Sequence, residues 1–302
     1  MSRVSVVITT YNRAQLLPRA IESAQNAASD LEVIVVDDCS TDDTPTLCEK
    51  IPDIRYVRLS HNQGLAAART AGISESRSEF IAFLDDDDLR LPHSLDKQLR
   101  ALNADDGLAF CYGQALIGDA ERQLPTGEIY PLNCPHGDIF WDLLEDNFIP
   151  MPTVVARKSS LVSEGGFNTA LHLIEDWDMW LRLSERSPIA AIAEPVAIYR
   201  KAVAASGQMC SNGAELYKQA ARVQRMALDR PRAQSSAATK RRHVQRKFRD
   251  RAYQLLMTEA ANLLHEGNAT SARANIKDAF RLRPFRTAVS GSLLWFSTPD
   301  KV

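Results

Sequence analysis

The chain has 302 residues, of which 45% are hydrophobic and 25% charged, and its formal net charge is only −2. These proportions exclude a disordered chain, a collagen-like repeat and a bundle of membrane spans. The charge is unevenly divided: residues 1–200 carry 31 acidic and 17 basic side chains, a net −14, whereas residues 201–302 carry 19 basic and 7 acidic ones, a net +12. This asymmetry predicts two regions that attract partners of opposite charge.

The sequence carries no pattern of an exported or membrane-embedded protein. No segment approaches the roughly 20 apolar residues of a membrane span, and the N-terminus leads into the strand-like Val4–Ile8 without a signal-peptide pattern. The five cysteines are scattered and include no C-x-x-C pair, which favours reduced thiols over a disulfide framework. We therefore expect a cytoplasmic protein.

The first 115 residues alternate between strand-like and helix-like segments. Apolar runs rich in β-branched residues predict strands at Val4–Thr9, Leu31–Val36, Ile54–Leu59, Phe80–Leu84 and Leu108–Tyr112. Helical spacing of Leu and Ala predicts helices around residues 16–24 and 95–102, and Thr44-Pro45 is typical of an N-cap followed by Pro in the first helical position. Such strands predict a parallel sheet with helices on both faces. Ligands bind these sheets beyond the C-terminal ends of the strands.

From residue 116 to 200 the pattern is interrupted by prolines. The predicted elements are a helix at Asp138–Asp146, a strand at Thr153–Ala156, a helix at Glu175–Arg186 and a strand that ends in Tyr199-Arg200. Beyond Lys201 a Gly- and Ser-bearing stretch, residues 206–213, is typical of a loop, and the composition then becomes helical and basic.

Polar residues follow three of the predicted strands. These ends read Thr9-Thr10-Tyr11-Asn12-Arg13, Asp37-Asp38-Cys39-Ser40 and Asp85-Asp86-Asp87-Asp88. The four aspartates are the most informative, because two like charges ~4 Å apart repel by about 1 kcal/mol even in water. They predict a site for Mg²⁺ or Mn²⁺, hard ions that take carboxylate oxygens and bridge to phosphates. A solvated, helix-capping turn ahead of Pro92 is the alternative.

Five ordered blocks resemble the signature of family 2 glycosyltransferases. The blocks are residues 9–13, residues 35–40, Asn62-Gln63-Gly64 through Ala68-Arg69, residues 83–88, and Gly165-Gly166-Phe167 followed by Glu175-Asp176-Trp177-Asp178. The resemblance covers residues 3–200 and implies a GT-A fold, an α/β architecture with a Rossmann-like, mostly parallel sheet flanked by helices. It implies a GT-A domain at 1–205, with nucleotide-sugar binding in 1–115 and acceptor binding in 116–205, followed by a basic α-helical region at 206–302.

The resemblance also implies roles for individual residues. Thr9, Tyr11 and Arg13 would contact the nucleotide, with the Tyr11 ring beside the base. Asp38 would accept a hydrogen bond from the base edge, and Arg69 would approach the donor phosphates or nucleoside from the Gly64 loop and the helix that follows it. In the D-x-D element Asp85 and Asp86 would contact the nucleotide sugar, Asp86 at the ribose or a metal-bound water, and Asp87 would bind Mn²⁺ or Mg²⁺. Asp176 would be the catalytic base.

These roles imply an inverting, metal-dependent transfer of a sugar from a nucleotide-diphospho sugar, with uracil favoured over guanine as the base. The expected acceptor is a glycan or lipid-linked glycan in polysaccharide biosynthesis. A carboxylate would take the acceptor's proton, and a cation would stabilise the leaving diphosphate. Two alternatives stay open: a haloacid-dehalogenase-like phosphotransferase, which also places D-x-D after a strand, and a non-catalytic nucleotide-sugar-binding scaffold.

Three of these residues also have structural interpretations. Tyr11 could be an ordinary turn aromatic, and Arg69 a surface arginine paired with Glu75. Asp176 could be a carboxylate favoured by the dipole at a helix N-terminus.

The chain departs from the family's pattern at three places. Thr70 stands where an Asn is common, Arg90 where an aromatic residue is common, and Ala202 where many members have a His that contacts metal or phosphate. Arg90 would alter donor-sugar contacts, and the missing His implies weak metal binding in the absence of nucleotide.

The C-terminal region is predicted to be helical across residues 214–296. Its dense basic stretch contains Arg241, Arg242, Arg246, Lys247, Arg249 and Arg251, and the apolar stripes that follow resemble one tetratricopeptide-like hairpin. A solvated face and an anionic membrane surface are both compatible with the charge, since each basic residue near such lipids contributes roughly 1 kcal/mol. Membrane binding would place the protein at the inner face of the membrane, with Leu293–Phe296 as a candidate anchor. No nucleic-acid partner is expected, because no recognition module accompanies the charge.

Overall fold

The computed structural model describes residues 3–119, 124–200 and 213–283. The chain divides into two compact units, Met1–Leu143 with Asn147–Ser206 and Leu144–Asp146 with Gly207–Val302. The predicted loop at 206–213 falls almost wholly outside the described residues, as do Ala202 and the segment Leu293–Phe296.

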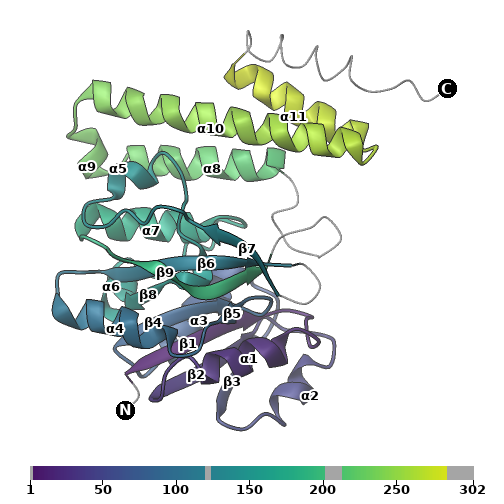
Figure 1. Cartoon of the computed structure of the whole chain (residues 1–302), viewed down its shortest axis with the longest axis vertical. Helices are drawn as coiled ribbons and strands as arrows, with labels where there is room; N and C mark the ends of the chain where they lie inside the picture. The colour runs from purple at the N-terminus through teal and green to yellow at the C-terminus, as the bar shows by residue number, and fades with distance from the viewer. Residues whose placement is uncertain (1–2, 120–123, 201–212, 284–302) are drawn as a thin grey trace. The chain divides into compact units, whose positions relative to one another are not determined.

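Within the described residues, one nine-stranded sheet forms the centre of the first unit (Figure 1), in the order β3-β2-β1-β4-β8-β6-β9-β5, with β7 paired to β6. The strands are β1 (Val4–Thr10), β2 (Leu31–Asp37), β3 (Ile54–Arg58), β4 (Phe80–Asp85), β5 (Leu89–Arg90), β6 (Phe110–Gly118), β7 (Pro125–Tyr130), β8 (Val155–Arg157) and β9 (Ala190–Arg200). The predicted parallel pairing is confirmed for β3, β2, β1 and β4.

Beyond β4 the sheet is mixed, which the prediction of a parallel sheet did not include. Strand β8 runs antiparallel to both β4 and β6, and β5 runs antiparallel to β9, whereas β6 and β9 are parallel. Parallel neighbours need a long crossover, usually a helix, whereas antiparallel ones do not.

Helices cover both faces of the sheet, as predicted. They are α1 (Leu17–Gln25), α2 (Thr44–Cys48), α3 (Leu65–Glu75), α4 (Ser94–Ala104), α5 (Phe140–Leu143), α6 (Lys158–Ser163) and α7 (Glu175–Arg186), with a 3₁₀ turn at Met151–Thr153. The apolar faces of α1 and α4 bury Leu17, Ile21, Leu95 and Leu99 against the valines of β1 and β2. On α7, Trp180 packs on Phe83 of β4 and Phe110 of β6. Strands β1, β2 and β4 are therefore buried on both faces, which explains their continuous apolar sequences.

Most element boundaries agree with the sequence patterns, and four differ. The strand predicted at Leu108–Tyr112 begins two residues later, at Phe110, and extends to Gly118 as β6. The predicted helix at Asp138–Asp146 shortens to α5, and the strand predicted at Thr153–Ala156 is β8, which follows the 3₁₀ turn. Helix α2 begins at Thr44 with Asp43 as its N-cap, so Thr44 is not the cap. Helix α7 has the predicted bounds, because its apolar and charged residues alternate at a regular helical spacing.

Helix α3 packs closely on β1 at Gly72. A Cβ at this position would lie 3.0 Å from Val7 Cγ2 and closer still to Cγ1. We expect Gly72→Ala to lower the free energy of unfolding by about 1–3 kcal/mol through overpacking, measured by urea denaturation. The control Ser74→Ala, on the exposed side of the same helix, should change it by less than about 0.5 kcal/mol. Equal stability of the two variants would contradict the close approach of α3 and β1.

The second unit is helical. It contains α8 (Gly213–Leu228), α9 (Pro231–Gln234), α10 (Ala238–His265) and α11 (Ala269–Leu282), and Figure 1 shows α10 and α11 side by side. Gly267, at φ +78°, and the N-cap Asn268 make the reversal between them. Tyr253, Leu256 and Ala279 form their buried contact. In the described ranges, no helix combines the length and the apolar character needed to cross a bilayer.

Candidate active site

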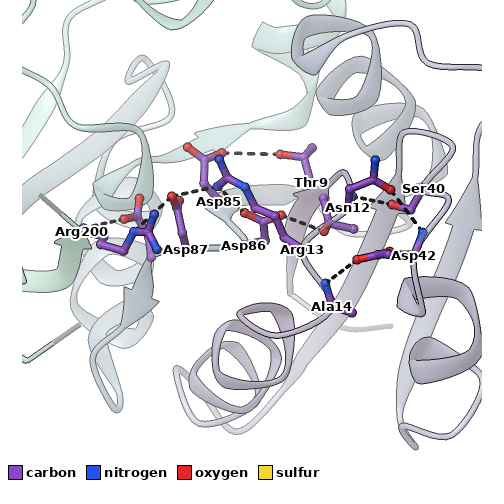
Figure 2. A network of polar contacts seen from close by, with 12 residues as sticks. Thr9, Asn12, Arg13, Ala14, Ser40, Asp42, Asp85, Asp86, Asp87 and Arg200 are labelled. Atoms are coloured by element: carbon purple, nitrogen blue, oxygen red, sulfur yellow. Dashed lines mark hydrogen bonds and ion pairs between the residues drawn. The ribbon is translucent and has the colours of Figure 1, made fainter. Parts of the chain in front are cut away.

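The first three of the four aspartates, Asp85, Asp86 and Asp87, lie at the end of β4, beside Thr9 and Arg13 at the end of β1 (Figure 2). Asp86, Asp87 and Asp88 are buried, and the side chain of Asp85 is 26% exposed. Thr10 Oγ1 donates to Asp86 Oδ2 at 2.7 Å, and Thr9 Oγ1 lies 3.5 Å from Asp85 Oδ1. The segment Asp85–Asp88, called the acid run below, is therefore bonded to the neighbouring strand. It does not project into solvent as a simple capping turn would.

Arginines neutralise the middle of the acid run. Arg13 Nη1 donates to Asp86 Oδ1 at 3.0 Å and to Asp87 Oδ2 at 2.8 Å. Arg200, the last residue of β9, places Nε 3.5 Å from Asp87 Oδ2, and its backbone N–H donates to Asp88 Oδ1 at 2.8 Å. The end of β9 is thus joined to the acid run through both its backbone and its side chain.

Burial raises the pKa of Asp86, Asp87 and Asp88, the three buried carboxyl groups of the acid run. The pKa of Asp86 rises to about 7, with Arg13 opposing the shift. The pKa of Asp87 is raised by burial and Asp85, and lowered by Arg13 and Arg200. Burial and the charge of Asp87 raise the pKa of Asp88 well above its usual range. Cationic neighbours are therefore what allows Asp86 and Asp87 to carry charge near neutral pH.

The turn after β1 is built by Asn12, which adopts a left-handed backbone at φ 54°. Its backbone N–H donates to Ser40 Oγ at 2.9 Å, and its side-chain oxygen accepts from the backbone N–H of Thr41 at 2.7 Å. Ala14 N also donates to Asp42 Oδ2 at 3.1 Å (Figure 2). These bonds clamp the ends of β1 and β2 together and leave Tyr11 44% exposed at the sheet edge.

Asp37 and Asp38 are both buried, and each one shapes a loop. Asp38 accepts from the backbone N–H groups of Gln63 at 2.7 Å and of Gly64 at 2.8 Å. Asp37 accepts from Ser40 N at 2.8 Å and from the Tyr56 hydroxyl at 2.6 Å. An ionised carboxylate has about four acceptor positions. Asp38 therefore holds the Gly64 loop while keeping acceptor capacity for a ligand.

Arg69 links the acid run to α7. This buried residue of α3 donates through Nη2 to Asp85 Oδ1 at 2.6 Å and through Nη1 to Glu175 Oε1. Its guanidinium lies 5.7 Å from the centre of the Phe167 ring. The alternative pairing of Arg69 with Glu75 is wrong, because Glu75 pairs with Arg55.

Thr70, one of the departures from the family pattern, has a clear structural role. Its hydroxyl accepts the backbone N–H of Phe167 at 3.0 Å. Gly166, at φ +78°, approaches Thr70 so closely that a Cβ there would lie 2.7 Å from the Thr70 methyl group. Thr70 therefore seats the Gly165-Gly166-Phe167 turn against α3, beside Arg69.

Asp176 lies in the first turn of α7, next to the Glu175 that Arg69 holds. Trp177 N donates to Asp176 Oδ1 at 2.6 Å, and Asn147 Nδ2 donates to Oδ2 at 3.3 Å. Burial and the neighbouring Glu175 raise the pKa of Asp176 to about 7, with Arg69 opposing them. A carboxyl with this pKa suits a general base near neutral pH.

Two residues of this arrangement, Arg200 and Asn147, were missed by sequence reasoning. Both reach the site through long-range contacts, so no local pattern marks them. The position of Arg200 at the end of a predicted strand was the one available signal.

Arg90, in contrast, does not face the donor side. It is buried, it donates to Gln98 Oε1 at 2.8 Å and to the Val154 carbonyl at 3.0 Å, and burial lowers its pKa to about 9. The expectation that Arg90 alters donor-sugar contacts is therefore wrong, because the pairing of β5 with β9 turns this side chain into the interior.

The sheet and its flanking helices define a fold of GT-A type. The model of the family described as "Glycosyl transferase family 2" matches residues 5–161, more than half of the chain. The protein therefore belongs to glycosyl transferase family 2.

Curated relatives carry related names. An uncharacterized glycosyltransferase of Haemophilus influenzae is 30% identical over 184 residues, which are 60% of this chain and 61% of that one. The GalNAc(5)-diNAcBac-PP-undecaprenol beta-1,3-glucosyltransferase of Campylobacter jejuni is 37% identical over 123 residues, 39% of each chain. This chain thus spans less than two thirds of the length of either relative.

Solved structures share the fold. S. aureus TarS 1–349 in complex with UDP-GlcNAc superposes with a TM-score of 0.63 at 17% identity, covering 95% of this chain and 83% of that one. The mannosyltransferase PcManGT from Pyrobaculum calidifontis, in complex with GDP-Man and Mn²⁺, gives a TM-score of 0.59 at 18% identity, covering 99% and 81%. At these identities the likeness shows the fold alone.

Proposed function

We propose that this protein transfers a sugar from a nucleotide-diphospho sugar, a UDP-sugar, to a glycan or lipid-linked glycan in polysaccharide biosynthesis. Family membership and the neighbour that binds UDP-GlcNAc support this, and the Campylobacter relative is named for an undecaprenol-linked glycan. One observation carries the proposal: Arg69 bonds Asp85 of the D-x-D run and Glu175, the neighbour of Asp176. Donor-side and base residues therefore meet at one edge of the sheet.

The proposed reaction is an inverting displacement. Asp176 takes the proton of an acceptor hydroxyl as its oxygen bonds to the anomeric carbon, and the bond from that carbon to the diphosphate breaks. The nucleoside diphosphate leaves with the bonding electrons. Asn147 and Trp177 N hold the Asp176 carboxylate in place, so a single positioned base suffices and no covalent intermediate is formed.

We assign donor binding to the strand ends of residues 1–115 and acceptor binding to 116–205, with 206–302 as an appended basic region. The residues assigned to the nucleotide sugar are Thr9, Tyr11, Arg13, Asp38, Gly64, Arg69, Asp85 and Asp86. The exposure of Tyr11 at the sheet edge supports a place for its ring beside a base. The acceptor capacity left on Asp38 supports its contact with the base edge.

The proposed divalent cation, Mn²⁺ or Mg²⁺, is assigned to this site together with the donor. In the part of the chain that the structure describes, no cluster of three or more His, Cys, Asp or Glu is arranged to hold a metal. Asp87 offers the hard carboxylate oxygens that such ions prefer. We therefore assign Asp87 as the residue that would hold the cation when the donor diphosphate is bound. A bound cation would neutralise charge on the leaving diphosphate.

The basic face of α10 supports a second contact, with an anionic membrane surface on the cytoplasmic side. Its arginines include the exposed Arg242, Arg246 and Arg249. Each basic residue near such a surface contributes about 1 kcal/mol. Flotation of the full chain with vesicles containing anionic lipid tests this contact, and absence of binding at low salt would refute it.

The direct test of the proposed function is a panel of nucleotide sugars with Mn²⁺ or Mg²⁺ and glycan acceptors, scored for released nucleoside diphosphate. Release from UDP-sugars is expected. Release of inorganic phosphate would instead identify a phosphotransferase, and nucleotide binding without turnover on any acceptor would favour a scaffold. The phosphotransferase places its D-x-D on an early strand, whereas this run follows β4.

The rate of transfer should depend on the protonation of Asp176. Below pH 7 the carboxyl holds its proton and cannot accept another, so the rate should fall about tenfold per pH unit and level off above pH 7. Asn147→Ala removes a hydrogen bond that favours the charged carboxylate of Asp176. The acidic limb of the pH–rate profile should therefore move to higher pH. The control Asn103→Ala, on α4, should leave it in place. A flat profile from pH 5 to 8 would contradict this role for Asp176.

A further inference from the structure

Two guanidinium groups hold a single oxygen of Asp87. Arg13 Nη1 lies 2.8 Å and Arg200 Nε 3.5 Å from the same atom, Oδ2 (Figure 2). Arg13 follows β1 and Arg200 ends β9, so segments far apart in the sequence converge on the carboxylate assigned to the cation. The oxygen that a divalent ion would take is therefore already contacted by positive charge.

The two arginines are held differently. The side chain of Arg200 is 6% exposed, and its backbone N–H is anchored on Asp88, which fixes the residue at the acid run. The side chain of Arg13 is 25% exposed and also bonds Asp86. Two positive charges thus balance Asp86 and Asp87 in the nucleotide-free protein. A divalent cation approaching Asp87 alone would meet both of them at close range.

We propose that Arg13 and Arg200 are the resident counter-charges of Asp87, and that they exclude a divalent cation until it arrives with the donor diphosphate. This inference rests on the proposed function. The diphosphate offers the guanidinium groups new anionic partners, and the planar fork of arginine matches phosphate oxygens. Once they pair with the diphosphate, Asp87 becomes accessible to the cation. Cation and nucleotide should therefore bind cooperatively.

The test is Mn²⁺ binding to the full chain, measured from the EPR signal of free Mn²⁺ with and without saturating UDP. UDP should tighten Mn²⁺ binding by about tenfold or more. Arg200→Met retains the side chain's bulk and removes its charge. It should tighten nucleotide-free Mn²⁺ binding several-fold and shrink the effect of UDP. Arg13→Met should also tighten nucleotide-free Mn²⁺ binding. Because Arg13 is more exposed than Arg200, this variant tests the proposal if Arg200→Met does not fold. The control Arg186→Met removes an exposed arginine paired with Glu164 at 3.0 Å and should change neither affinity.

Mn²⁺ binding that is equally tight with and without UDP would overturn the inference. So would Arg13 and Arg200 variants whose nucleotide-free Mn²⁺ affinity equals that of the wild type. Failure of UDP to bind in the presence of Mn²⁺ would instead refute the proposed function. The nucleotide-free affinities of the variants would still decide whether the arginines guard Asp87.

Discussion

Asp176→Asn is expected to slow sugar transfer by about 10²–10⁴-fold, the range that a positioned general base contributes, while leaving UDP binding unchanged. Asparagine keeps the shape of the side chain and can still accept from Trp177 N, which bonds Asp176 Oδ1 at 2.6 Å. It cannot take a proton from an acceptor hydroxyl. The loss should therefore appear in kcat, measured by release of nucleoside diphosphate, and not in the Kd for UDP, measured by calorimetry.

A matched control separates loss of the base from loss of a nearby charge. Asp106→Asn changes a carboxylate of a loop whose side chain is 97% exposed and pairs with Arg157 at 3.1 Å. Such exposed pairs contribute little, so this variant should transfer sugar at the wild-type rate. If Asp176→Asn did the same, another group would be the base. If it lost UDP binding as well, Asp176 would have a structural role in the donor site.

Arg69→Met is expected to lower the free energy of unfolding by about 3–5 kcal/mol, the cost of leaving buried charge without its partner. Arg69 is buried between Asp85 and Glu175, and Glu175 is itself buried. Methionine fills much of the volume but cannot hydrogen-bond either carboxylate. Urea denaturation measures the loss. The control Arg55→Met, whose pair with Glu75 is partly exposed, should cost less than about 1 kcal/mol.

A double variant tests the physical reason for this effect. Arg69→Met with Glu175→Gln leaves only the more exposed Asp85 without its cation, so part of the lost stability should return. If the double variant were instead less stable by the sum of the two single effects, the two side chains would not be coupled. The loss would then come from packing against Phe167 rather than from charge.

Local patterns in the sequence determined much of the fold. Helix α7 has its predicted bounds because its apolar residues recur with the 3.6-residue period of an α-helix. Strands β1, β2 and β4 were predictable because burial on both faces makes them apolar throughout. The mixed half of the sheet was not predictable, since β8 and β5 are only three and two residues long. Strands this short carry no periodicity, and their direction depends on their neighbours.

The candidate site was likewise predictable from the sequence only in part. The chain order of the strands indicates that Thr9, Asp38 and Asp85 share a sheet edge, because parallel strands end on the same side. No local pattern shows that Arg69 reaches both Asp85 and Glu175, or that Arg90 turns inward. These outcomes depend on how helices pack on the sheet, so only the tertiary structure decides them.

The sequence by itself determined which residues carry the chemistry: an acid run after a buried strand, a carboxylate pair at the start of a helix, and a basic C-terminal region of +12. Only the tertiary structure decided which charges face one another. The net charge of the chain is only −2, yet the fold places Arg13 and Arg200 beside Asp87, and Arg69 beside Asp85. The physical reason is that burial makes an unpaired charge costly, so distant arginines are stable only where the fold places them beside the aspartates.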